Sequence, residues 1–84
     1  MNELKKIVIA KKYKLITPLD AKKFVWITSR FKDNVDCIEI NRNVSAKSIL
    51  GVLSLDLFHP IIVQFHDVYG NEEMFDELKE WEVE

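Results

Sequence analysis

The spacing of apolar residues changes repeatedly along the chain, and the resulting order of segments constrains the fold most. Segments rich in β-branched residues predict strands at 4–13, 34–40 and 59–67, with a short further strand at 42–45. Helical spacing predicts helices at 16–33, 49–57 and 71–81. This order, β-α-β-β-α-β-α, lacks strict βαβ alternation. We therefore expect an α+β fold with a four-stranded antiparallel sheet covered on one face by three helices.

The start of the first helix carries the strongest local signal. Thr17 is a good N-cap, Pro18 suits the first helical position, and Asp20 lies three residues after the cap. At helical spacing we expect these residues to face the core: Ala21, Phe24, Val25, Thr28 and Phe31.

Length and composition indicate one small globular domain spanning residues 1–84. The apolar content of 48% and the charged content of 31% are those of an ordinary globular protein. Apolar runs are too short for a membrane span, and the N-terminus lacks the apolar stretch of a signal peptide, so we expect a cytoplasmic protein. The single cysteine, Cys37, fits a buried structural thiol in a reducing compartment.

Charge is divided unevenly between the two halves of the chain. Residues 1–47 hold 11 Lys/Arg and 5 Asp/Glu, a net of +6, whereas residues 48–84 hold 1 Lys and 9 Asp/Glu, a net of −8. One interpretation is a basic half that faces an acidic partner. The interpretation we favour is that the halves interleave and neutralise each other. Nucleic-acid binding is disfavoured, because the net charge of −2 is negative and no basic run carries interleaved aromatic residues.

The segment 43–57, NVSAKSILGVLSLDL, carries more apolar surface than a short core helix needs. On a helical wheel its six large aliphatic side chains span roughly 220°, wider than an ordinary core-facing stripe. Val52 and Leu55 fall together and are expected in the core. Ile49, Leu50 and Leu53 fall on the other side.

The same segment resembles the regulatory-serine segment of HPr, the small phosphocarrier protein of the bacterial sugar phosphotransferase system. The nine residues from Lys47 to Leu55, KSILGVLSL, follow that family's pattern in order. Chain length, element order and an acidic last helix agree with the family. The resemblance implies an HPr-like open-faced β-sandwich.

The chain departs from the family where phosphate is carried. Gap-free alignment from Ser48 places Thr17 at the position of the family's phosphorylated histidine and Leu19 at that of its arginine. A threonine hydroxyl lacks the nucleophilic imidazole nitrogen that forms a labile phosphoramidate. We therefore expect no phosphocarrier chemistry and no enzyme activity, and we interpret His59 and His66 as structural or surface residues.

The resemblance implies a protein-docking surface on the first two helices. Leu19 and Trp26 share a stripe away from the core side of the first helix, beside the second aliphatic side described above. The complete set of expected partner-binding residues is Leu19, Trp26, Lys47, Ile49, Leu50 and Leu53, with Lys22 and Lys23 at the rim. The alternative is that some of these side chains complete the core.

Ser48 has two interpretations. It is an N-cap of the short helix, and by resemblance it is also a candidate for phosphorylation by the family's kinase. A phosphate would be favoured there by the free N–H groups of the helix start.

The strands suggest a second apolar surface. Aligning the strands by the resemblance to HPr places Val8, Ala10, Val35, Cys37, Val63 and Phe65 toward the helices. The opposite face then holds Ile7, Ile9, Ile38, Ile40 and Ile62, an apolar surface that would suit a homodimer or another partner. The alternative is an error of one residue in strand phase, which moves a whole strand's side chains to the other face.

These observations predict a non-catalytic, HPr-like regulatory or adaptor protein. Its expected partners are proteins: an HPr kinase, a transcriptional regulator or enzymes of the phosphotransferase system. A phosphocarrier modified at another residue and a purely structural dimeric domain remain alternatives. The sequence shows no metal-ligand cluster and no cofactor motif, so we expect neither a metal nor a cofactor.

Overall fold

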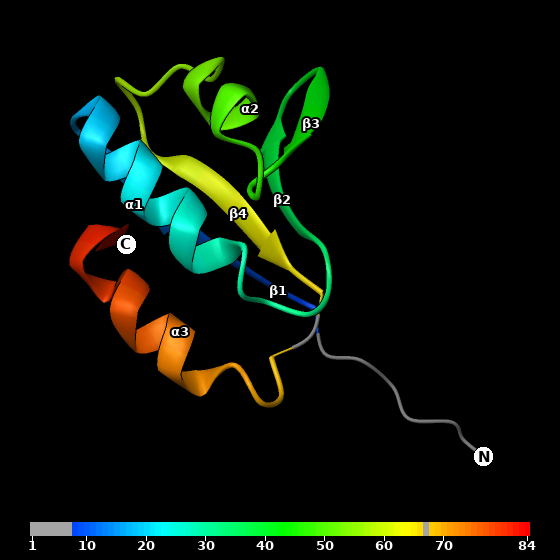
Figure 1. Cartoon of the computed structure of the whole chain (residues 1–84). Helices are drawn as coiled ribbons and strands as arrows, with labels where there is room; N and C mark the ends of the chain where they lie inside the picture. Colours follow the sequence, from blue (N-terminus) through cyan, green and yellow to red (C-terminus); the bar gives the residue numbers. More distant parts are fainter. Residues whose placement is uncertain (1–7, 67) are drawn as a thin grey trace.

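The computed structural model describes residues 8–66 and 68–84. Within them the order of elements is β1 (Ile9–Tyr13), α1 (Pro18–Thr28), β2 (Val35–Glu39), β3 (Arg42–Ser45), α2 (Ile49–Leu53), β4 (Ile61–Phe65) and α3 (Glu72–Leu78), then a 3₁₀ turn η1 (Lys79–Trp81) and β5 (Glu82–Val83). The three helices lie on the same side of the sheet (Figure 1). The predicted α+β class and the order up to α3 are confirmed.

The sheet has one strand more than the four that the sequence predicts. Its order is β3-β2-β4-β1-β5, and every neighbouring pair is antiparallel. The extra strand, β5, pairs Glu82 with Tyr13 and Val83 with Lys12. Buried Trp81 holds the end of the last helical segment against the core, and its carbonyl accepts a hydrogen bond from the Lys14 amide at 2.8 Å. The chain that follows must therefore run along the free edge of β1.

The predicted strand phase is right for β2 and β4. Val35 and Cys37 on β2 are buried, and so are Val63 and Phe65 on β4. The other side of these strands forms the open face of the sheet, where Ile38 and Ile62 lie opposite each other.

The predicted phase is wrong for β1. Ile9 pairs with buried Phe65 and packs against the core, while Val8 and Ala10 are exposed. The cause is Tyr13, which shares the face of Ile9 and is fully buried against the rings of Phe24 and Phe65. Burial of this large ring outweighs that of two small side chains and sets the alternation of the whole strand. Ile7 lies outside the described residues.

The core is built around aromatic rings between the helices and the sheet. Six of them have neighbouring centroids 4.7–6.2 Å apart: Tyr13, Phe24, Phe31, Phe65, Phe75 and Trp81. All five residues of the first helical segment that were expected to face the core are buried, as are Val52 and Leu55. The Thr28 hydroxyl donates to the Ala46 carbonyl at 2.6 Å, which ties α1 to the connection that leads into α2.

Among the described residues, two ion pairs join a Lys or Arg of the basic half to a Glu of the acidic half. Lys11 pairs with Glu82 at 3.2 Å, and Arg30, just after the end of α1, pairs with Glu77 on α3. These ion pairs support the interpretation that the two halves of the chain interleave and partly neutralise each other's charge.

Candidate functional site

Thr17 lies at the N-cap of α1 and forms a complete capping box. Its hydroxyl accepts a hydrogen bond from the Asp20 amide at 3.1 Å. In return one carboxylate oxygen of Asp20 accepts from the amides of Thr17 and Ile16, each at 3.2 Å. Both side chains are therefore engaged in starting the helix, as the spacing of threonine, proline and aspartate predicts.

The environment of Asp20 disfavours a role as a general base for Thr17. Partial desolvation acts to raise the pKa of Asp20, but hydrogen bonds from the amides of Thr17 and Ile16 and from the Trp81 side chain outweigh it and lower the pKa below its ordinary value. A carboxylate with a lowered pKa is a weaker base. The pair has the geometry of a helix cap.

Ser48 caps α2 in the same manner. Its exposed side chain accepts a hydrogen bond from the Gly51 amide at 3.0 Å. A Cβ at Gly51 would lie 3.3 Å from the Ser48 side chain and 3.4 Å from the Ser45 carbonyl oxygen, so glycine lets the helix start close to β3. The cap function of Ser48 is therefore confirmed.

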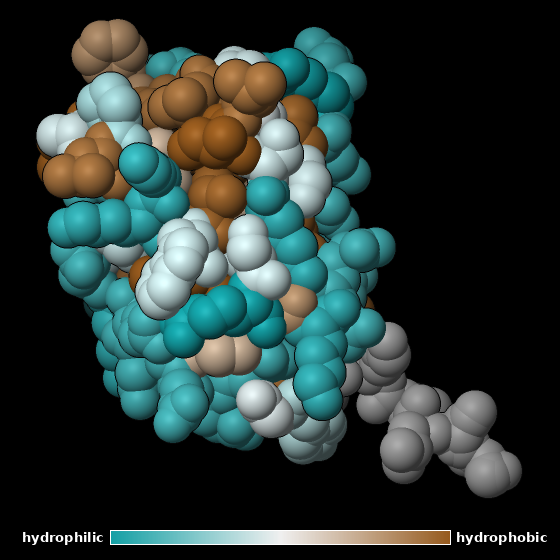
Figure 2. Space-filling model, viewed as in Figure 1, coloured by the Kyte–Doolittle hydropathy of each residue, from teal (hydrophilic) through white to brown (hydrophobic). Residues whose placement is uncertain are grey.

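Large apolar side chains project into solvent from α1 and α2. Their exposed fractions are 58% for Leu19, 65% for Trp26, 78% for Leu50 and 43% for Leu53. We call these four residues the docking surface. Hydrophobic side chains gather over α2 and the neighbouring end of α1 (Figure 2). The alternative that these four complete the core does not hold.

Ile49 differs from the four residues of the docking surface. It is half-buried and packs against the core. Ile49 is the first residue of α2, where the Cα–Cβ bond tilts toward the helix N-terminus and thus toward the chain that leaves β3. The prediction that its side chain faces away from the core is therefore wrong.

Trp26 is held in place on the surface. The Arg30 guanidinium lies over its indole ring, 4.8 Å from the ring centroid, and the same guanidinium pairs with Glu77 of α3. Such cation–π stacking restricts both side chains. Trp26 is thus presented to solvent as an ordered ring.

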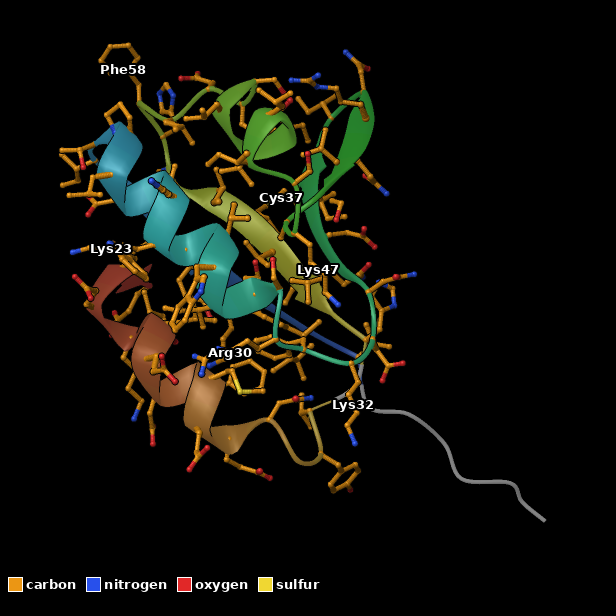
Figure 3. All side chains as sticks on the ribbon, viewed as in Figure 1. Lys23, Arg30, Lys32, Cys37, Lys47 and Phe58 are labelled. Atoms are coloured by element: carbon orange, nitrogen blue, oxygen red, sulfur yellow. The ribbon has the colours of Figure 1, made fainter. Side chains whose placement is uncertain are left out.

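The expected rim lysines occupy two kinds of environment. Lys22 and Lys23 are exposed on α1 and make no ion pair with the described residues; Figure 3 shows Lys23 directed away from the protein. Lys47 is half-buried, and its ammonium group donates to the Phe31 carbonyl just beyond α1. Lys47 therefore ties α2 to the end of α1.

Two exposed apolar residues near the start of α1 were missed by the sequence analysis. Ile16 is 75% exposed and Phe58 is 89% exposed. The Lys14 ammonium donates to the Leu57 carbonyl at 2.9 Å and so joins the segments that carry them. In Figure 3 Phe58 projects from the loop between α2 and β4. Ile16 falls at the start of the predicted helix 16–33 but precedes α1 in the structure, and Phe58 belongs to no helical period, so only its position next to turn-forming residues could have marked it.

The remaining reactive side chains have structural contacts. His59 is exposed and lies 3.0 Å from Asp56, and His66 lies 2.9 Å from Asp36. The hydrogen bond from His59 is the main cause that lowers the pKa of Asp56. Cys37 is buried, and its burial raises its pKa to about 12, which keeps the thiol protonated and unreactive at neutral pH.

Metal-ligating groups and cavities do not coincide with the docking surface. Among the described residues, no three His, Cys, Asp or Glu side chains are placed to hold one metal ion. A hollow of about 880 Å³ lies at the β2–β3 hairpin and is lined in part by Ile38, Ile40 and Ile62. In the part of the chain that the structure describes, no helix combines the length and the apolar character needed to cross a bilayer.

Comparison with protein families, with curated proteins and with solved structures gives no match for this chain.

Proposed function

We propose that this protein is a non-catalytic, HPr-like adaptor or regulator that binds partner proteins through the docking surface of α1 and α2. The observation that carries the proposal is the exposure of Leu19, Trp26, Leu50 and Leu53 on two adjacent helices. Exposed apolar patches of this kind mark interaction sites, and tryptophan is a favoured anchor residue at interfaces.

The resemblance to HPr supports the same proposal from a second direction. The nine-residue run from Lys47 to Leu55 covers α2 and its cap, and in that family the helix surface it belongs to binds partner proteins. The docking surface thus combines exposed residues of this chain with the segment that most resembles the family.

The cap geometry of Thr17 supports a non-catalytic role. Thr17 and Asp20 are hydrogen-bonded to each other and to backbone amides, and the lowered pKa of Asp20 disfavours activation of the hydroxyl. A phosphate ester on threonine would also be too stable to be passed on. On this proposal the chain keeps the docking function of a phosphocarrier without its chemistry.

Ser48 is proposed as the residue that gates docking. Its side chain is exposed at the start of α2, two residues before Leu50. A phosphate there would add about two negative charges beside the apolar surface and would change which partners bind.

The proposal is tested with a bacterial HPr kinase and ATP. We expect phosphate on Ser48 in the wild type, read by mass spectrometry, and at least tenfold slower modification of the variant Trp26→Ala/Leu50→Ala, because docking precedes transfer. The matched control is Tyr69→Ala, which removes a large exposed side chain outside the docking surface and outside the open face of the sheet. An unmodified wild-type Ser48 would contradict the gate, and equal rates for all three proteins would contradict the docking surface.

A phosphocarrier modified at another residue is the alternative. Incubation with the first enzyme of the phosphotransferase system and phosphoenolpyruvate separates the two, because acid-labile phosphate on this chain would replace our proposal by the alternative.

A further inference from the structure

The face of the sheet opposite the helices carries a band of exposed apolar side chains. Exposed Ile62 and half-buried Ile38 lie side by side on neighbouring central strands, and Val8, Ile40 and Val83 are exposed in or next to the strands of the sheet. Two hollows, of about 880 and 470 Å³, flank Ile62, which lines both. A one-sided antiparallel sheet normally turns polar residues to water on this face, so the band indicates that something covers it.

The charged residues of this open face are arranged on the two sides of the central strand β4. Lys12 of β1 pairs with Ile62 of β4, and Ile62 in turn pairs with Ile38 of β2. Asp36 of β2 lies two residues further along, in the row of Gln64, where one of its carboxylate oxygens also contacts His66 at 2.9 Å. On the open face, Lys12 therefore lies on one side of β4 and Asp36 on the other. Their rows are two residues apart along the strands, a separation of about 7 Å.

Such an arrangement is complementary to itself. If two copies pack face to face with a two-fold axis along β4, β1 of each copy lies over β2 of the other. Lys12 of one copy then comes within reach of Asp36 of the other, twice over, and the isoleucines meet between the two pairs. Packed sheets lie about 10 Å apart, a gap that an extended lysine side chain largely spans.

The docking surface cannot pair with itself in this way. Its flank on α1 carries Lys22 and Lys23, which would face their own copies across a two-fold axis. A lipid or nucleic-acid surface is equally ill-matched to the open face of the sheet, whose lysine and aspartate balance.

We infer that the open face of the sheet binds a second copy of this chain and forms a two-fold symmetric dimer. The inference does not depend on what the docking surface binds. In this dimer the helices of both copies lie on the outside, so two docking surfaces point in opposite directions and the dimer can bind two partners at once. Five short strands offer about 400 Å² of face per copy, below the size of a standard interface, so the dimer is weak and depends on concentration.

The test measures the mass of the full chain by sedimentation and light scattering from micromolar to millimolar concentration. We expect a monomer at the low end and a dimer at the high end. Lys12→Glu and Asp36→Lys should each weaken the dimer by about tenfold or more, because each variant brings like charges together. A mixture of the two variants should recover the dimer, since the two substituted side chains then carry opposite charges and face each other, as do the two unchanged ones.

The mixing experiment also controls for folding, since a misfolded variant could not regain a partner. A wild type that stays monomeric at millimolar concentration would overturn the inference. So would a dimer that both charge variants leave unchanged, or one that is lost in Trp26→Ala, which would place the contact on the helices. Partner binding by the docking surface is read separately with the kinase assay, so either result can fail alone.

Discussion

At the scale of single residues, Tyr13 is the most informative. Its ring is fully buried and sets the phase of β1, yet within the described part of the chain its hydroxyl has no hydrogen-bond partner. A buried polar group without a partner costs free energy that an apolar group of the same shape does not. Tyr13 therefore supports the fold through its ring and opposes it through its hydroxyl.

This cost leads to a prediction for Tyr13→Phe. The substitution keeps the ring contacts with Phe24 and Phe65 and removes the hydroxyl, so it should raise the free energy of unfolding by about 1 kcal/mol. Urea unfolding followed by circular dichroism measures the change. A loss of stability by a similar amount would show that the hydroxyl has a partner.

The same variant should change the response to alkaline pH. Burial, with a further contribution from the charge of Glu82, raises the pKa of Tyr13 above the ordinary value of about 10. The unfolded chain then loses the Tyr13 proton at lower pH than the folded chain. The contribution of protonated Tyr13 to the free energy of unfolding is therefore complete below pH 10 and is lost as the pH rises further. Tyr13→Phe should lose less stability than the wild type in that range.

At the scale of elements, α2 depends on its cap. The helix has only five residues, and the Ser48 side chain satisfies one of its few free amides. Its packing relies on fully buried Val52 and on half-buried Ile49, so the cap and these two core contacts hold the segment that presents Leu50 and Leu53.

Ser48→Ala should therefore lower the free energy of unfolding by about 1 kcal/mol, whereas Ser48→Asp should stay within about 0.5 kcal/mol of the wild type, because aspartate caps as well as serine. Chemical unfolding of the two variants side by side provides the measurement. Equal stability of Ser48→Ala and the wild type would show that the hydrogen bond to Gly51 contributes nothing.

Elements also show what local sequence can and cannot predict. The start of α1 follows from Thr17, Pro18 and Asp20 alone, because a capping box is a contact among neighbours. The phase of β1 does not, because it is decided by the contact of Tyr13 with Phe65, 52 residues away. β5 has only two residues, both exposed, so no alternation marks it.

For the candidate site, too, local sequence predicts the exposure of some residues and cannot place others. Exposure of Leu19 and Trp26 follows from their spacing on a regular helix. The orientation of Ile49 could not be resolved by periodicity, since α2 is less than two turns long. Ile16 and Phe58 lie in connecting segments, where no period exists to place them.

At the scale of the whole molecule, the fold separates two apolar surfaces. The docking surface lies on the helices, and the exposed apolar side chains of the further inference lie on the opposite, open face of the sheet. The aromatic core lies between the two. Arg30 links α1 to α3 through Glu77 and also stacks on Trp26, so the docking surface is anchored to the rest of the domain. On the proposed function, this separation lets the protein bind a partner on one face without disturbing the other.

The central claim is that the exposed residues of α1 and α2 serve binding and not folding. Affinity capture from the source cells, quantified by mass spectrometry, tests it with the wild type, Trp26→Ala/Leu50→Ala and the control Tyr69→Ala, each first shown to unfold within about 1 kcal/mol of the wild type. The account predicts a protein that is retained by the wild type and the control and is depleted at least tenfold by the double variant. Capture of the same proteins in equal amounts by all three chains, or unfolding of the double variant, would contradict it.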